Sequence, residues 1–312
     1  MIKKTLYFGN PANLSYSRQQ LVWSNPNAMK EDVHPFLKFE NERTFPIEDI
    51  GFLILDHPQI IITTYLLQKL AENNVIVMTC DDKHHPNGLL LPLVGNNLLS
   101  ERHKIQVKVD LPTKKRLWKQ IISVKILNQS IVLRKLNKLE ESNNLKMLSE
   151  NVKVGDTNNH EATAAAYYWN NLFDFDFKRN PDGTPPNNLL NYGYSIVRSA
   201  VARAIVSSGL IPSLGLHHRN KYNPFCLADD LMEPFRPIVD FYIISNFPTL
   251  QNIELDTETK RKLLEIYTID VLIDKETSPL MIACNRMAAS LVKCFQKKQR
   301  KLSVPLLNDW FI

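Results

Sequence analysis

The sequence lacks several features that define well-known classes of protein. It contains no run of about 18 apolar residues, so we expect no membrane-spanning helix. The basic N-terminus MIKKTLYFGNP is not followed by the apolar core of a secretory signal, which favours a cytoplasmic protein. A GxxxxGKS or GxxxxGKT loop is also missing, which is consistent with chemistry that needs no nucleoside triphosphate as an energy source.

Cysteine is scarce, and its four positions form no metal-binding pattern. Cys80, Cys226, Cys284 and Cys294 make no CxxC pair, which excludes a zinc ribbon. A reducing cytoplasm would keep these side chains unpaired, so we expect buried free thiols.

The length of 312 residues predicts about two domains, which the sequence pattern assigns to the α+β class. Short β-branched or aromatic runs (TLYFG, QLVW, FLKFE, GFLIL and VIVMT) predict a small β-rich domain over residues 1–80, with one helix over residues 57–74. Its motifs carry no obvious chemistry, and we expect it to provide a dimer or partner interface. Turn-forming residues over 81–97 indicate a linker.

Residues 98–312 predict a larger all-α domain. Apolar residues at helical spacing predict a helix over residues 112–136. Gly209 is placed to end a second helix in the left-handed conformation. Ser278-Pro279 is a typical helix start, and we expect a long basic helix from there to about Lys301.

Positive charge is concentrated in two stretches of the helical domain. Residues 103–138 contain ten Lys or Arg against one acidic residue, and residues 286–301 contain six and no acid. Such stretches indicate a surface for a polyanion, although solvated helix faces would look the same. The side chains that we expect to contact DNA are Lys114, Lys115, Arg116, Lys119, Arg198, Arg203, Arg286, Lys297 and Lys298.

The most informative stretch is LGLHHRNKYNPFCLADDLMEPFRPIVD, residues 214–240. Asp230 and Glu233 are three residues apart on a predicted helix, so their carboxylates share one face. The turn that follows His217 and His218 could fold one imidazole over that face. One imidazole with carboxylates suits Mg²⁺ or Mn²⁺. The alternative is that Asp230 and Glu233 form a capping box at a helix start and bind no metal.

The residues of this stretch resemble the active-site segment of the CRISPR-associated spacer integrases, the Cas-one family, and most closely its type II branch. The segments EATAAAYYW, GNPANLS and PIEDIGFLIL also resemble this family. The resemblance implies that Glu161, His218 and Glu233 are the metal ligands and that Asp230 is a fourth catalytic residue. For Glu161 the residue pattern leaves an alternative, because Asn158 and Glu161 also match a capping box.

The resemblance implies a metal-dependent DNA endonuclease and integrase. It would insert short foreign DNA fragments, the spacers, into a CRISPR repeat array by attack of a 3′-hydroxyl on a phosphodiester. Expected partners are double-stranded DNA, a second copy in a homodimer, a small Cas-two protein in a heterohexamer, and a Cas-nine-type effector. Two alternatives stay open: a metal-dependent nuclease for branched DNA, and a non-catalytic scaffold that binds nucleic acid.

Overall fold

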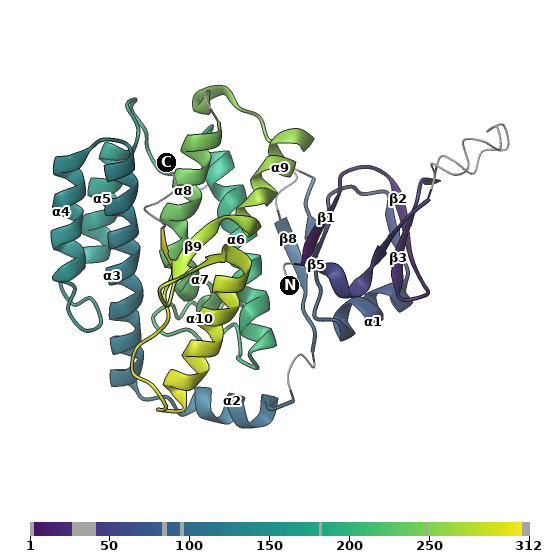
Figure 1. Cartoon of the computed structure of the whole chain (residues 1–312), viewed down its shortest axis with the longest axis horizontal. Coiled ribbons are helices and arrows are strands. Elements are labelled where there is room, and N and C mark those ends of the chain that lie inside the picture. The colour runs from purple at the N-terminus through teal and green to yellow at the C-terminus, as the bar shows by residue number, and fades with distance from the viewer. Residues whose placement is uncertain are drawn as a thin grey trace. The chain divides into compact units, whose positions relative to one another are not determined.

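The computed structural model describes residues 3–26, 42–82, 86–93, 97–180, 183–247 and 249–307. The chain divides into two compact units, Met1–Asn97 and Leu98–Ile312 (Figure 1). The first unit is rich in strands and the second is mainly helical, which confirms the predicted α+β class. Within the described ranges, no helix is long and apolar enough to cross a membrane.

Two four-stranded sheets form most of the first unit. The first sheet has the order β1-β5-β7-β8 and joins Lys4–Phe8, Ile50–Leu55, Ile76–Cys80 and Pro86–Leu90. The pairs β1-β5 and β5-β7 are parallel, whereas β7-β8 is antiparallel. The second sheet has the order β4-β3-β2-β6 and joins Glu42–Pro46, Gln20–Ser24, Ala12–Ser17 and Ile60–Ile62. A 3₁₀ turn, Ile47–Asp49, leads into β5.

One helix, α1 (Thr64–Glu72), packs its apolar side into the core that both sheets share. Leu66 and Leu70 of α1 lie fully buried in one cluster with Leu14 of β2, Leu21 of β3 and Leu53 of β5. Burying such side chains is the main source of stability for a unit of this size.

Two boundaries in the first unit differ from the prediction, and one predicted strand is not described. The helix expected from residue 57 begins only at Thr64, because the β-branched run Ile60–Ile62 pairs with β2 as a strand. Thr63 is its N-cap and accepts a hydrogen bond from the Leu66 amide. Strand β8 lies inside the stretch expected to be a linker, and it extends the sheet beside β7. The predicted strand FLKFE, residues 36–40, lies outside the described residues.

The second unit contains nine α-helices among its described residues, with a small three-stranded sheet (Figure 1). The helices are α2 (Leu99–Val107), α3 (Leu111–Lys135), α4 (Leu139–Glu150), α5 (His160–Leu172), α6 (Asn187–Ser207), α7 (Cys226–Met232), α8 (Arg236–Asn246), α9 (Thr257–Leu263) and α10 (Leu280–Phe295). The sheet has the order β10-β9-β11 and joins Glu276–Pro279, Asp270–Ile273 and Leu306–Leu307. Short 3₁₀ turns occupy Glu233–Phe235, Leu250–Asn252 and Leu264–Thr268.

The start of α3 and the end of α6 each have an identifiable cause. The carboxylate of Asp110 caps α3 by accepting a hydrogen bond of 2.7 Å from the Thr113 amide. Gly209 ends α6 with a φ of +67°, as predicted. The Leu210 amide donates to the carbonyl of Ile205, and the Gly209 amide donates to that of Val206, which is the Schellman pattern.

The expectation for the last helix is wrong at both ends. Ser278 belongs to strand β10, and α10 begins at Leu280 with Pro279 in the N-cap position. The helix ends at Phe295, so Lys297 and Lys298 lie in the connection to β11. The prediction of buried free thiols is confirmed for Cys226, Cys284 and Cys294, whereas Cys80 is only partly buried.

Candidate active site

Glu161 lies in the first turn of α5, but it does not cap that helix. The carboxylate of Asp156 performs this role and accepts hydrogen bonds from the amides of His160 (2.9 Å) and Glu161 (3.0 Å). Asn158, the predicted N-cap, does not occupy the N-cap position of α5. The Glu161 side chain instead accepts a hydrogen bond of 2.7 Å from Nζ of Lys125 on α3. The capping-box alternative for Glu161 is therefore wrong.

Glu233 lies in the 3₁₀ turn between α7 and α8 and is 4% exposed. Its Oε1 accepts a hydrogen bond of 2.9 Å from Nε of Arg236, and its Oε2 lies 2.5 Å from Nζ of Lys125. Burial alone would raise the pKa of Glu233, but the charges of Arg236 and Lys125 outweigh burial and lower the pKa to about 2. The capping-box alternative for Asp230 and Glu233 is wrong, because α7 begins at Cys226.

Lys125 joins the two glutamates and is a site residue that the sequence pattern did not single out. Its ammonium is bonded to Glu161 and paired with Glu233, and the residue is 8% exposed. Burial lowers the pKa of Lys125, but the charges of the two glutamates outweigh it and raise the pKa. A signal was present, since Lys125 falls within the apolar stripe that Ile121, Ile122 and Ile126 form on α3.

Asp230 is fully buried and organises the loop that carries His218. Its Oδ1 lies 2.7 Å from Nδ1 of His218, and its two oxygens accept hydrogen bonds from the amides of Leu216, His217 and His218. Gly215 is required at the start of this loop. A Cβ there would lie 2.4 Å from the His218 carbonyl oxygen and 2.8 Å from the Asp230 carboxylate.

The indole ring of Trp118 packs against the rings of both histidines. The His217 ring stacks on it with centroids 4.3 Å apart and planes 1° apart, and the His218 ring meets it edge-on at 5.8 Å. Trp118 is 1% exposed and is therefore a core residue. The hydrogen bond to Asp230 raises the pKa of His218, although partial burial opposes it. Among the described residues, Nε2 of His218 has no hydrogen-bond partner.

The structure therefore brings the three predicted ligands to one region. The carboxylates of Glu161 and Glu233 converge on one ammonium, and the charges of His218 and Glu233 are close enough to shift each other's pKa. Two carboxylates and an imidazole whose Nδ1 is held by a third carboxylate form a donor set that fits a divalent cation. Among the described residues, no three such side chains already stand at ligand spacing, and the Lys125 ammonium lies where the two carboxylates meet.

Asn128, one turn after Lys125, fixes the position of the Glu233 turn. Its Nδ2 donates to the carbonyl oxygens of Pro234 (2.7 Å) and Pro305 (3.1 Å), and its Oδ1 accepts from the Leu307 amide (2.9 Å). Asn128 is fully buried. One amide side chain thus connects α3, the Glu233 turn and strand β11.

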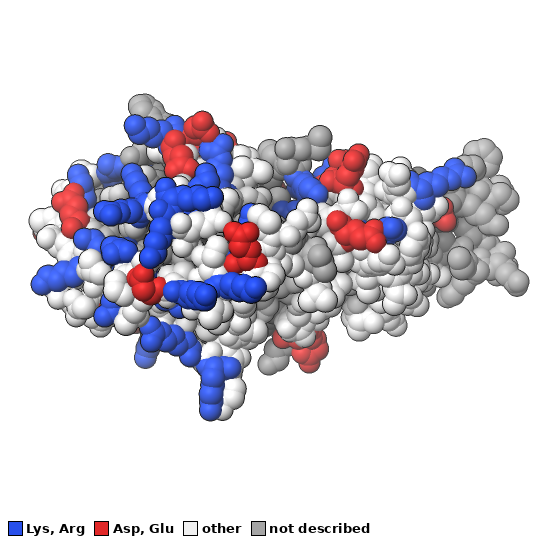
Figure 2. All heavy atoms as spheres, turned by 90° about the horizontal axis from the view of Figure 1, so that it is seen from below, with Lys and Arg blue, Asp and Glu red and all other residues white. Residues whose placement is uncertain are grey.

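Most of the predicted DNA contacts lie on the surface of the helical unit. Lys115 and Arg116 are exposed and Lys114 and Lys119 are half-buried, all in the first turns of α3. Lys297 and Lys298 are exposed after α10. Figure 2 shows Lys and Arg side chains predominating on one face of this unit.

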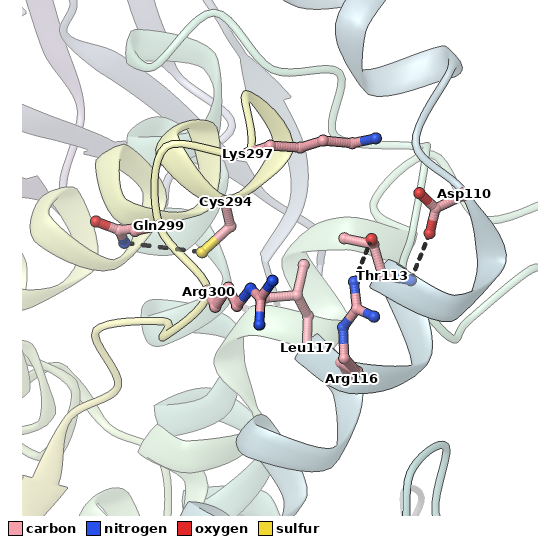
Figure 3. Close-up of a pocket in the computed structure, with 8 residues that line it drawn as sticks. All are labelled: Asp110, Thr113, Arg116, Leu117, Cys294, Lys297, Gln299 and Arg300. Carbon is pink, nitrogen blue, oxygen red and sulfur yellow. Dashed lines mark hydrogen bonds between the residues drawn. The ribbon is translucent and has the colours of Figure 1, made fainter.

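A pocket of about 240 Å³ lies between the start of α3 and the segment after α10. The positively charged side chains of Arg116, Lys297 and Arg300 line it (Figure 3). Its one acid, Asp110, is already bonded to the Thr113 amide. Gln120 holds the two segments together by hydrogen bonds with backbone atoms of Arg300 and Leu302.

Three of the residues predicted to contact DNA are either buried or paired with an acidic side chain of the same unit. Arg203 is 7% exposed within α6, and burial lowers its pKa, so its assignment as a DNA contact is wrong. Arg198 forms a two-bond pair with Asp229 at 2.6 and 3.0 Å. Arg286 pairs with Glu276 at 2.7 Å. Charge alone does not reveal such partners.

A family model described as "CRISPR associated protein Cas1" matches residues 9–275. The chain belongs to the Cas1 family. It is similar to the CRISPR-associated endonuclease Cas1 of Neisseria meningitidis serogroup C (strain 8013), with 33% identity over 98% of this chain and 96% of that protein. The resemblance to this family that the sequence motifs predicted is thereby confirmed.

Solved structures share the fold of the whole chain. A casposase bound to an integration product superposes with a TM-score of 0.78 at 22% identity, over 100% of this chain and 96% of that one. A Cas1 protein from Thermotoga maritima superposes with a TM-score of 0.68 at 15% identity, over 94% of this chain and 97% of that one. The Cas1 fold thus accounts for both units.

Proposed function

We propose that the protein is a divalent-metal-dependent DNA integrase and endonuclease that inserts short DNA fragments into a CRISPR repeat array. The observation that carries this proposal is the convergence of Glu161 and Glu233 on one cation beside His218. Two similarities support it: the meningococcal relative is described as an endonuclease, and the casposase is described with an integration product.

Glu161, Glu233 and His218 would hold Mg²⁺ or Mn²⁺. Such an ion, when bound, would polarise a phosphodiester oxygen and stabilise the charge that develops as a 3′-hydroxyl attacks. The transfer exchanges one phosphodiester bond for another, so no external energy source is needed. Asp230 would orient His218 through Nδ1 and leave Nε2 for the ligand role.

The basic face of the helical unit would bind the phosphate backbone of the DNA. Lys114, Lys115, Arg116 and Lys119 lie at the start of α3. Arg116 and Lys297 line the pocket between α3 and the segment after α10, and Lys298 follows Lys297 in that segment. Contacts of this kind give affinity without sequence selection, and each one adds about 0.9 to the slope of log affinity against log salt.

The partners we propose are a second copy of the chain, a small Cas2 protein in a heterohexamer, and a Cas9-type effector. A structure described as a Cas6-RT-Cas1–Cas2 complex matches 99% of this chain, with a TM-score of 0.71 at 19% identity and 36% of that chain covered. The similarity shows a shared fold and motivates a direct test of Cas2 binding.

The test is an integration assay with purified Cas2 partner, a short duplex and a supercoiled repeat plasmid. Glu161→Ala, His218→Ala and Glu233→Ala are compared with Glu140→Ala, which removes an exposed carboxylate from α4. We expect the three site variants to lose Mg²⁺- or Mn²⁺-dependent strand transfer while their circular dichroism spectra and the control's activity stay unchanged. Normal transfer in all three site variants would overturn the assignment.

The same assay separates the alternatives. Cleaved strands without joined product, with the partner present, would favour a nuclease for branched DNA. DNA binding by the wild type with neither cleaved nor joined product would favour a non-catalytic scaffold. That neither Glu161 nor the pair Asp230 and Glu233 caps a helix is evidence against that alternative.

A further inference from the structure

Asp240 on α8 is a buried carboxylate that joins three helices. It is 1% exposed, and each of its oxygens accepts a hydrogen bond from a buried tyrosine. The Tyr194 hydroxyl of α6 donates to Oδ1 at 2.5 Å, and the Tyr168 hydroxyl of α5 donates to Oδ2 at 3.1 Å. Asp240 is not one of the predicted ligands or catalytic acids.

Both tyrosines connect Asp240 to the candidate active site. Tyr168 follows Glu161 by seven residues on α5, so the two side chains leave nearly the same face two turns apart. The guanidinium of Arg236 lies over the Tyr194 ring, 4.8 Å from its centroid, and its Nε donates to Glu233. One route from Asp240 therefore leads to the helix of Glu161, and the other leads to the carboxylate of Glu233.

A role in packing alone does not account for a carboxylate at this position. Burying a carboxylate is unfavourable, and an apolar side chain of similar volume often stabilises a core as well or better. A carboxylate that accepts two hydroxyl hydrogen bonds does what an apolar side chain cannot, because it fixes the direction of both partners. The constraint lies where α5, α6 and α8 must be held in register for Glu161 and Glu233 to face each other.

We infer that Asp240, acting through Tyr168 and Tyr194, is a positioning residue that holds α5 and Arg236 so that the carboxylates of Glu161 and Glu233 converge. The inference rests on the proposed function for its kinetic consequence. An error of about 1 Å in the position of a reacting group can cost about a hundredfold in rate. The network therefore controls the rate of strand transfer and leaves DNA affinity unchanged.

The test uses variants that remove one hydroxyl and keep the ring. Tyr168→Phe and Tyr194→Phe are compared with Tyr267→Phe, whose buried hydroxyl bonds Ser199 in the same unit. We expect kcat for strand transfer to fall about tenfold or more in the first two variants, with KM for DNA unchanged and melting temperatures lowered no more than the control's. Equal kcat values for all three variants would overturn the inference.

A conservative rescue and a second readout separate positioning from general destabilisation. Asp240→Asn, which keeps one acceptor oxygen, should retain more kcat than Asp240→Ala at matched fractions of folded protein. A double-mutant cycle on urea unfolding combines Tyr194→Phe with Glu233→Gln. Each variant changes the equilibrium constant for unfolding by some factor relative to the wild type. If the two residues are coupled through Arg236, the factor for the double variant should differ about threefold or more from the product of the factors for the two single variants.

The unfolding cycle does not depend on activity. If the wild-type protein transfers no strands, the proposed function fails, while coupling in the cycle would still support the network. Additive effects in the cycle would overturn the positioning role even in an active integrase.

Discussion

Replacing Lys125 by Met tests whether one ammonium holds the candidate active site together without a metal ion. The variant leaves the carboxylates of Glu161 and Glu233 without the cation that now lies 2.7 and 2.5 Å from them. Removing one partner of a buried ion pair costs about 3–5 kcal/mol. Because the Glu161 side chain is 25% exposed and water can relieve part of the repulsion, we expect the lower value, about 3 kcal/mol.

That loss has a measurable size and a specific remedy. It corresponds to a fall in melting temperature of about 6–12 °C for a unit of this length. An added Mn²⁺ ion must displace the ammonium in the wild type, whereas in Lys125→Met it meets two carboxylates with no competing cation. A ligand at a hundred times its Kd stabilises the folded state by about 2.7 kcal/mol, so saturating Mn²⁺ should restore most of the variant's stability.

Thermal unfolding, followed by circular dichroism first in EDTA and then over a Mn²⁺ titration, measures both effects. The control is Arg286→Met in the same unit, whose guanidinium pairs with Glu276; these two side chains are 36% and 66% exposed. Exposed pairs contribute about 1 kcal/mol or less, so this variant should melt close to the wild type and respond to Mn²⁺ as the wild type does. If Lys125→Met melts like the control, or if Mn²⁺ raises all three melting temperatures equally, the counter-ion reasoning is refuted.

Three further predictions concern the DNA surface, the histidine loop and pH. Replacing Lys114, Lys115 and Arg116 together by Ala should weaken duplex binding similarly for all sequences and flatten its salt dependence by about 0.9 per lost contact, which fluorescence anisotropy measures; a sequence-selective loss would contradict backbone binding. Gly215→Ala should abolish strand transfer, because its Cβ would meet a carbonyl oxygen at 2.4 Å; wild-type kcat would show that the loop can shift. Burial raises the pKa of Asp240 from 3.8 to about 7, so the unfolded chain releases this proton first and wild-type stability should fall as pH rises between these values. Urea unfolding at pH 5 and pH 8 should therefore show the stability of Asp240→Asn rising relative to that of the wild type by about 2.7 kcal/mol, because two pH units at about 1.4 kcal/mol each separate pH 5 from the folded-state pKa. Parallel profiles would contradict the shift.

Local sequence patterns predicted those parts of the molecule that depend on neighbouring residues. Gly209 ends α6 as expected, since a left-handed residue at a helix end needs no distant partner. Asp230 and His218 could be paired from one continuous motif. The capping box predicted for Asn158 and Glu161 is wrong because Asp156 accepts the hydrogen bonds of the amides at the start of α5. The spacing of residues in the sequence does not reveal this competition.

The errors arise where distant segments decide the outcome. The charge pattern places Lys125 among the basic surface residues, although its contacts depend on two glutamates that lie 36 and 108 positions away. The charge of Arg203 predicts a DNA contact, but the residue lies within a run of small apolar residues on α6 that the fold buries. In both cases a cationic residue on an apolar helix face was the available signal, and it indicated burial rather than a phosphate contact.

Asn128 links β11, the last described strand, to the turn that contains Glu233. Because the same amide binds Pro305, Leu307 and the carbonyl that follows Glu233, cutting the chain after residue 302 would strip two of the three bonds from a fully buried side chain. Each orphaned polar atom costs about 1–3 kcal/mol, and the cost falls one helical turn from Lys125. A truncation at this end of the polypeptide would thus disturb the candidate active site through Asn128, without removing any of the predicted ligands.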